Sequence, residues 1–115
     1  MAGKLTTHVL DTVRGVGAGG LRISVRRLAP EVTASRMVAL GDDGRALLLE
    51  GADFTAGQYE IVFFVGEYRR GTPPQSGTEP FFEDVPVRFS VGDPSRAYHV
   101  PLIMSPFGYT TYLGS

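Results

Sequence analysis

Short segments of β character, separated by glycines and prolines, fill most of this chain. Fifteen glycines and eight prolines occur among 115 residues, and apolar residues keep a helical spacing for no more than about two turns. Frequent short strands with turn residues between them are typical of a β-sandwich. We therefore predict a single domain over residues 1–115, all-β in class, with about eight strands. The expected elements are strands at 5–11, 21–26, 37–40, 46–49, 58–65, 85–91, 98–104 and 107–113, with one short helical turn at 67–70.

A turn signal divides the segment from residue 37 to residue 49. Gly41-Asp42-Asp43-Gly44 lies between two apolar runs, and an Asp-Gly pair strongly favours a local chain reversal. We predict a hairpin between residues 37–40 and 46–49, with Arg45 just after the turn. By itself, an arginine in that place is usually a solvated strand end. The segment lacks the longer ligand series and final glutamate of an EF-hand loop, so we interpret it as a turn rather than a calcium site.

The charge and the residue content exclude several classes of partner. A formal net charge of −1, with no long run of like charges, predicts neither a nucleic-acid partner nor binding to an anionic membrane. No apolar stretch approaches the roughly 18 residues that a membrane span needs, and no apolar signal core precedes the first strand. The absence of cysteine excludes disulfides and thiolate metal sites and is consistent with a reducing compartment. We expect a cytoplasmic protein.

The two histidines lie near opposite ends of the chain, each inside a run of β character. His8 belongs to residues 5–11 and His99 to residues 98–104. Because side chains alternate between the faces of a strand, both imidazoles can face the same way. Residues 98, 100, 102 and 104 form a natural core face, while His99 shares the opposite face with Pro101 and Ile103. That face is apolar enough to suggest a subunit interface or a cleft, although each imidazole could equally be a hydrogen-bonded structural residue.

The residues offer little for a metal ion or for a nucleotide. His8 and His99 are far apart in the chain, and no local spacing of His, Asp and Glu accompanies them, whereas catalytic zinc usually has three protein ligands. The glycine-rich segment Gly15–Gly20 matches no complete nucleotide motif and leads into a strand rather than a helix. We predict no metal site and interpret the glycine-rich segment as a flexible connection.

Several blocks along the chain, in combination, resemble the transthyretin-like 5-hydroxyisourate hydrolases. The blocks are Leu5–Thr12, Gly41–Arg45, Phe81–Glu83, Tyr98–Leu102 and Gly108–Ser115. The resemblance implies a transthyretin-type sandwich of two sheets that assembles as a homotetramer, with active sites in channels between subunits. It also implies hydrolysis of 5-hydroxyisourate to 2-oxo-4-hydroxy-4-carboxy-5-ureidoimidazoline during urate breakdown, without a cofactor.

The same resemblance assigns roles to individual residues. The catalytic histidines and arginine of the family fall on His8, Arg45 and His99, positions that are replaced in the hormone-carrying transthyretins. The family ends in Tyr-Arg-Gly-Ser, and this chain ends in Tyr112-Leu113-Gly114-Ser115. Ser115 is expected to relay a proton or bind the substrate, and Tyr112 to line the channel. Leu113 stands where the family has arginine.

The leucine at position 113 leaves two alternatives to 5-hydroxyisourate hydrolysis. If the missing guanidinium bound substrate, the chain could be a related ring-opening hydrolase that acts on a different heterocycle. It could also be a non-catalytic transthyretin-like carrier of a small ligand, because a fold alone does not define an activity. Strand alternation predicts that the replacement of arginine by Leu113 affects the site less, since it places Tyr112 and Gly114 on one face and Leu113 on the other.

Overall fold

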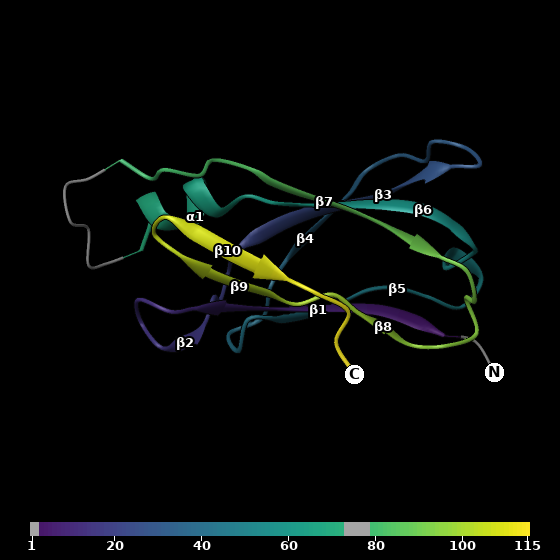
Figure 1. The fold of residues 1–115 in the computed structure, drawn as a ribbon, viewed down its shortest axis with the longest axis horizontal. Coiled ribbons are helices and arrows are strands. Elements are labelled where there is room, and N and C mark those ends of the chain that lie inside the picture. The colour runs from purple at the N-terminus through teal and green to yellow at the C-terminus, as the bar shows by residue number, and fades with distance from the viewer. Residues whose placement is uncertain (1–2, 73–78) are drawn as a thin grey trace.

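The strands form two sheets that face each other, as the long view in Figure 1 shows. The structure is a computed structural model and describes residues 3–72 and 79–115. One sheet is six-stranded and contains β1 (Lys4–Asp11), β2 (Val16–Gly17), β5 (Arg45–Glu50), β8 (Tyr98–His99), β9 (Leu102–Ser105) and β10 (Gly108–Thr111). The other is four-stranded, in the order β4 (Arg36–Ala39), β3 (Arg22–Ala29), β6 (Gly57–Phe63) and β7 (Val85–Val91). The all-β class predicted from the sequence is confirmed.

Two short helical segments connect strands. A 3₁₀ turn, η1 (Gly51–Asp53), follows β5, and the helix α1 (Val65–Arg70) follows β6. The helical turn expected at residues 67–70 therefore starts two residues earlier than predicted and continues from the end of the most hydrophobic strand. Among the described residues, no helix has both the length and the apolar character that a membrane span requires.

Strand β1 is the centre of the six-stranded sheet. Its first half pairs with β5 on one edge and with β8 on the other, and its last residues pair with β2 and β9. The pairs with β8 and β9 are parallel, whereas those with β2 and β5 are antiparallel. One strand therefore brings together the beginning, the middle and the end of the chain.

Strict alternation along the strands builds the core. On β1 the residues at odd positions are buried and Thr6, His8 and Leu10 are only partly covered. The inward sets predicted at residues 21, 23 and 25 and at residues 98, 100, 102 and 104 are all buried. Burial of each such apolar side chain stabilises the fold by about 1.5–3 kcal/mol. The largest side chains in the core are Tyr59, Phe63, Leu5, Leu21, Ile23, Leu48, Ile61 and Leu102.

The predicted hairpin between residues 37–40 and 46–49 is wrong. The local reversal exists, because Gly44 has a φ of 78° and its N–H donates to the carbonyl of Gly41 at 2.8 Å. Yet β4 pairs with β3 in one sheet and β5 pairs with β1 in the other. An Asp-Gly turn specifies that the chain reverses but not that the flanking strands pair, and here each strand extends a different sheet.

The strand count differs from the prediction at two places. The strand expected at residues 98–104 is divided into β8 and β9, with Pro101 between them. Proline has no N–H to donate to a strand ladder, so the ladder is interrupted there. The two-residue strand β2 arises from the glycine-rich segment, which pairs with the end of β1.

A buried carboxylate connects the end of β1 to α1. Asp11 is fully buried and accepts hydrogen bonds from the Tyr68 hydroxyl at 2.9 Å and from the Val13 N–H at 3.0 Å. The Arg69 guanidinium lies 3.3 Å from the same carboxylate. Because an isolated buried charge is costly, these partners make the position of α1 depend on Asp11.

Candidate functional site

His8 and Arg45 face each other across the pair formed by β1 and β5. They are direct partners in the antiparallel register, so their side chains lie on the same face of the sheet. His8 is half-buried, whereas the Arg45 side chain is 60% exposed. Asp43, in the preceding turn, accepts a hydrogen bond from the Arg45 N–H at 3.0 Å. The turn thus positions the first residue of β5 opposite the imidazole.

His99 reaches the same face from the other edge of β1. It is the parallel partner of Thr6, and the Thr6 Oγ1 atom lies 2.8 Å from the His99 Nδ1 atom. Thr6 and His8 are two residues apart on one strand and therefore share a face. The alternation argument had predicted that both imidazoles could face the same way, and this register places them so. His8, Arg45 and His99 gather on the outer face of the six-stranded sheet.

The surroundings of His99 favour its neutral form. Partial burial lowers the pKa of His99 below its ordinary value, and the charges of Arg45 and His8 lower that pKa further. A neutral imidazole with Nδ1 held by Thr6 has one free ring nitrogen, Nε2. That nitrogen can accept or donate a proton at neutral pH, depending on the tautomer.

The end of the chain lies against His99. Gly114 forms an antiparallel bridge with His99 and donates its N–H to the His99 carbonyl at 2.7 Å. A Cβ atom at position 114 would lie only 2.7 Å from the His99 Cδ2 atom. The bridge therefore requires glycine at this position. It brings Ser115, the next residue, close to the imidazole.

The other two residues of the closing tetrapeptide are open to solvent in the protomer. Tyr112 is 51% exposed and Leu113 is 56% exposed. β10 ends at Thr111, so the strand predicted to reach residue 113 is shorter than expected. Thr111 donates a hydrogen bond to the Pro101 carbonyl at 2.8 Å, which fixes the point where the chain leaves the sheet.

The face around the histidines is apolar and incompletely covered. Leu47, the partner of Thr6 on β5, is 48% exposed. Leu10 and Ile103 are neighbours in the register and are half-buried. An apolar surface that surrounds polar side chains is typical of an interface or a binding site.

Thr6 was not among the candidate functional residues predicted from the sequence. The structure shows that its hydroxyl is the polar contact of the His99 ring. The spacing of two residues from His8 indicates that Thr6 lies on the site face. Only the register between β1 and β8 identifies its partner, and that pairing spans 93 residues of sequence.

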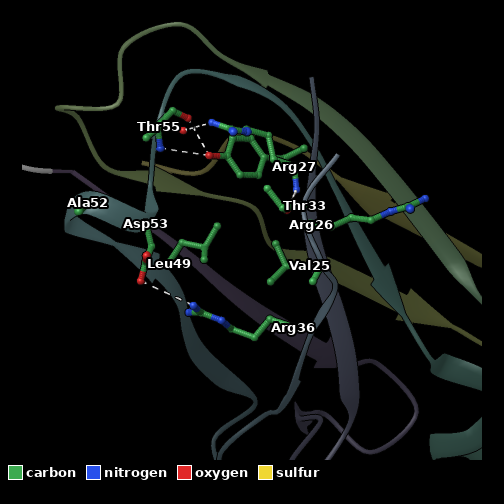
Figure 2. Close-up of a pocket in the computed structure, with 11 residues that line it drawn as sticks. Val25, Arg26, Arg27, Thr33, Arg36, Leu49, Ala52, Asp53 and Thr55 are labelled. Atoms are coloured by element: carbon green, nitrogen blue, oxygen red, sulfur yellow. Dashed lines mark hydrogen bonds and ion pairs between the residues drawn. The ribbon is translucent and has the colours of Figure 1, made fainter. Parts of the chain in front are cut away.

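No cluster that could hold a metal ion was found within residues 3–72 and 79–115: no group of three or more His, Cys, Asp and Glu side chains comes together there. A cavity lies elsewhere, against the four-stranded sheet, and Figure 2 shows the side chains that line it. None of His8, Arg45, His99, Tyr112 and Ser115 belongs to that lining.

Comparison with known proteins shows the family to which this chain belongs. The model of the HIUase/Transthyretin family matches residues 5–114. A 5-hydroxyisourate hydrolase of Mesorhizobium japonicum is 48% identical over 116 residues, which cover 98% of this chain and 93% of that protein. The chain belongs to the HIUase/transthyretin family.

Solved structures of this family's fold include proteins with different names. A crystal structure of (S)-allantoin synthase matches with a TM-score of 0.90 and 41% identity, covering 99% of this chain and 44% of that one. Sea bream transthyretin in complex with thyroxine matches with a TM-score of 0.79 and 27% identity, covering 96% of this chain and 94% of that one. The two-sheet transthyretin-type sandwich is thus confirmed. The fold alone does not separate enzymes from carriers within the HIUase/transthyretin family.

Proposed function

We propose that this protein hydrolyses 5-hydroxyisourate to 2-oxo-4-hydroxy-4-carboxy-5-ureidoimidazoline in urate catabolism, without a cofactor. The proposal rests on one observation: His8, Arg45 and His99 lie on the same face of the six-stranded sheet. The hydrolase of Mesorhizobium japonicum, similar over nearly the whole length, supports the same reaction.

Opening the ring requires three actions. Water must lose a proton as its oxygen attacks a ring carbonyl, the resulting oxyanion must be stabilised, and the ring nitrogen must gain a proton as the C–N bond breaks. A neutral imidazole can take the proton of water, and the imidazolium that results can give it to the leaving nitrogen, while a guanidinium suits the oxyanion. The proton taken from water is thus returned to the leaving nitrogen, and no other reactant is needed.

We assign the base to His99. Its lowered pKa keeps the ring neutral, and Thr6 occupies Nδ1 so that Nε2 remains for the water. In the tautomer with a proton on Nδ1, the Thr6 oxygen accepts that N–H and the Nε2 lone pair takes the proton of water. When the C–N bond breaks, the proton held by His99 passes to the leaving nitrogen, either directly or through His8, which also orients the water. Arg45 holds the substrate and stabilises the oxyanion.

Two residues of the closing segment complete the proposed site. Ser115 follows the bridge to His99 and would relay a proton or bind the substrate through its hydroxyl or terminal carboxylate. Tyr112, half exposed in the protomer, would line the wall of the site.

The active unit is proposed to be a homotetramer. In one protomer the site is open to solvent, since Arg45, Leu47 and Tyr112 are exposed. A second protomer placed over this face by closed symmetry would exclude water and strengthen the electrostatic effect of Arg45. Sedimentation should find a tetramer, and a fully active monomer would contradict this arrangement. We also propose a cytoplasmic location, which the absence of cysteine supports.

Leu113 supports a second candidate, a ring-opening hydrolase for a different heterocycle. It is exposed beside the closing bridge, where a longer cationic side chain could reach a substrate. A third reading, a non-catalytic carrier of a small ligand, has the fold in its favour because sea bream transthyretin shares it. The histidines and Arg45 favour an enzyme over a carrier.

The deciding experiment is a direct assay. 5-Hydroxyisourate is generated freshly from urate, and its absorbance decay is followed with the natural protein and with Leu113→Arg. Acceleration by the natural protein is expected. Acceleration by Leu113→Arg alone would support a changed substrate, and no acceleration by either protein, with binding of a heterocycle retained, would support a carrier.

A further inference from the structure

A second site lies at the cavity of about 260 Å³ shown in Figure 2. It opens between the end of β3, the start of β4 and the segment after β5. Its floor is apolar, because Val25 and Tyr59 are each 1% exposed and Leu49 is half-buried. Its rim carries the guanidinium groups of Arg27 and Arg36. A cavity with an apolar floor and a few convergent polar groups is the usual form of a small-molecule site.

Arg26 and Arg27 are neighbours on β3 but lie on opposite faces. The Arg26 side chain points away from the other lining residues in Figure 2, and its Nε atom lies 3.2 Å from the Glu60 carboxylate. Glu60 also pairs with the Arg88 guanidinium at 3.0 Å, so Arg26 and Arg88 share one carboxylate on the outer face. Arg27 is directed to the inner face instead, on the same side of the strand as Val25.

Among the described residues, the partner of the Arg27 guanidinium is neutral. Its Nη1 atom donates to the Thr55 hydroxyl, while its Nε atom is buried and has no acceptor. No carboxylate lies within ion-pair distance of Arg27 among residues 3–72 and 79–115. A half-buried guanidinium without a counter-charge carries a desolvation cost that an anionic ligand would offset.

The rest of the rim does not supply that counter-charge. Asp53 lies beside Arg36, with 3.6 Å between the carboxylate and the guanidinium. Arg36 also donates to the Leu48 carbonyl at 3.2 Å. With Asp53 engaged by Arg36, the positive charge of Arg27 has no carboxylate partner within the described part of the chain.

We propose that this cavity binds a small organic carboxylate with a flat apolar body. The carboxylate accepts hydrogen bonds from the Arg27 guanidinium, and the apolar body packs on Val25, Leu49 and Tyr59. The apolar floor distinguishes this ligand class from inorganic phosphate, which would leave that surface without a partner. The site is independent of the proposed hydrolysis, since none of the residues assigned to that reaction lines it.

The test uses benzoate as the probe, with benzyl alcohol and inorganic phosphate as comparison ligands. Titration followed by amide NMR shifts on the wild-type protein reports both affinity and location. Benzoate should shift Thr33, Thr55 and their neighbours and bind about tenfold or more tightly than either comparison ligand, since a charge-assisted hydrogen bond and the apolar contact are both required. Equal binding of benzyl alcohol, or benzoate shifts confined to the His8 and His99 face, would overturn the proposal.

Variants of the two adjacent arginines then test which guanidinium binds the carboxylate. Arg27→Gln should weaken benzoate binding by about tenfold or more, whereas Arg26→Gln, the same change at the adjacent residue, should leave it within about twofold. Unchanged binding in a folded Arg27→Gln protein would overturn the site. If Arg27→Gln does not fold, the wild-type comparison of benzoate with benzyl alcohol decides. Hydrolase activity in the absence of benzoate should be the same in Arg26→Gln and wild type, so failure of this site and failure of the proposed reaction are distinguishable.

Discussion

Thr6 and His99 meet across a parallel strand pair, with 2.8 Å between the threonine hydroxyl oxygen and the Nδ1 atom of the imidazole. This contact orients the ring and engages Nδ1, and the proposed mechanism uses the other ring nitrogen, Nε2. On the opposite face of β1, Thr7 donates its hydroxyl to the Val100 carbonyl at 2.7 Å. Two adjacent threonines thus bind two adjacent residues of the last part of the chain, one in the proposed site and one in the core.

This pair of threonines allows a matched test of positioning. Thr6→Val should lower kcat by about five- to tenfold, because a hydrogen bond worth about 1 kcal/mol no longer holds the His99 ring. Thr6→Ser should restore the rate. Thr7→Val removes the same hydroxyl from the core and should lower stability by about 1–3 kcal/mol with little change in kcat. Steady-state kinetics and urea unfolding distinguish the two effects, and equal kcat losses in both valine variants would rule out positioning by Thr6.

Each histidine should be essential to turnover. His8→Ala and His99→Ala are expected to lower kcat by about 10²- to 10⁴-fold, the usual contribution of a side chain that transfers protons. Both variants should keep the wild-type circular dichroism spectrum, since neither imidazole is in the core. Near-wild-type rates in both variants would contradict the proposed mechanism.

The acid limb of the pH profile should report His99. Burial and the charges of Arg45 and His8 lower the His99 pKa, so the neutral base persists below the ordinary imidazole value of about 6.5. Activity should therefore fall only as the pH drops through that lowered pKa. Arg45→Gln removes a nearby positive charge and should move the acid limb to higher pH, in addition to lowering kcat. A kcat–pH profile measured for both proteins checks the direction, and a shift to lower pH would contradict the electrostatic argument.

Gly114 should tolerate no side chain. In Gly114→Ala the new Cβ would lie 2.7 Å from the His99 Cδ2 atom, so either the ring or the closing segment must move. A misplaced imidazole should lower kcat by about tenfold or more. Gly92→Ala is the control, because a Cβ there meets nothing within 4 Å and the position has no positive φ. Equal rates for the two variants would show that the bridge does not position His99.

The buried contact of Asp11 with α1 should contribute more to stability than an exposed ion pair of the same helix. Asp11→Asn leaves Arg69 without its counter-charge in a largely buried place, which should cost about 3 kcal/mol. The exposed Arg22–Glu67 pair is the comparison, and Glu67→Gln should cost less than about 1 kcal/mol. Free energies of unfolding from urea titration test both values. Similar losses in the two variants would mean that burial does not strengthen the Asp11 contact.

The faces of the strands were predictable from the sequence because side-chain alternation is a local property. The order of polar and apolar residues in β1 and in residues 98–104 is enough to place His8 and His99 on outward faces. The resemblance to a known family added Arg45, which pattern alone would have left as a solvated strand end. The hairpin prediction was wrong because turn chemistry describes four residues and does not select the partner of each flanking strand.

The sequence by itself determined the all-β class, the inward and outward sets of residues and the membership of His8 and His99 in strands, since these depend on neighbours along the chain. The tertiary structure decided that Thr6 is the partner of His99 and that His8 is opposite Arg45. It also decided that Arg27 lies beside a cavity and, among the described residues, has no carboxylate within ion-pair distance. These relationships depend on register between segments distant in sequence. Register is set by the packing of the two inner sheet faces against each other, because a slip of one residue would turn every core side chain outward.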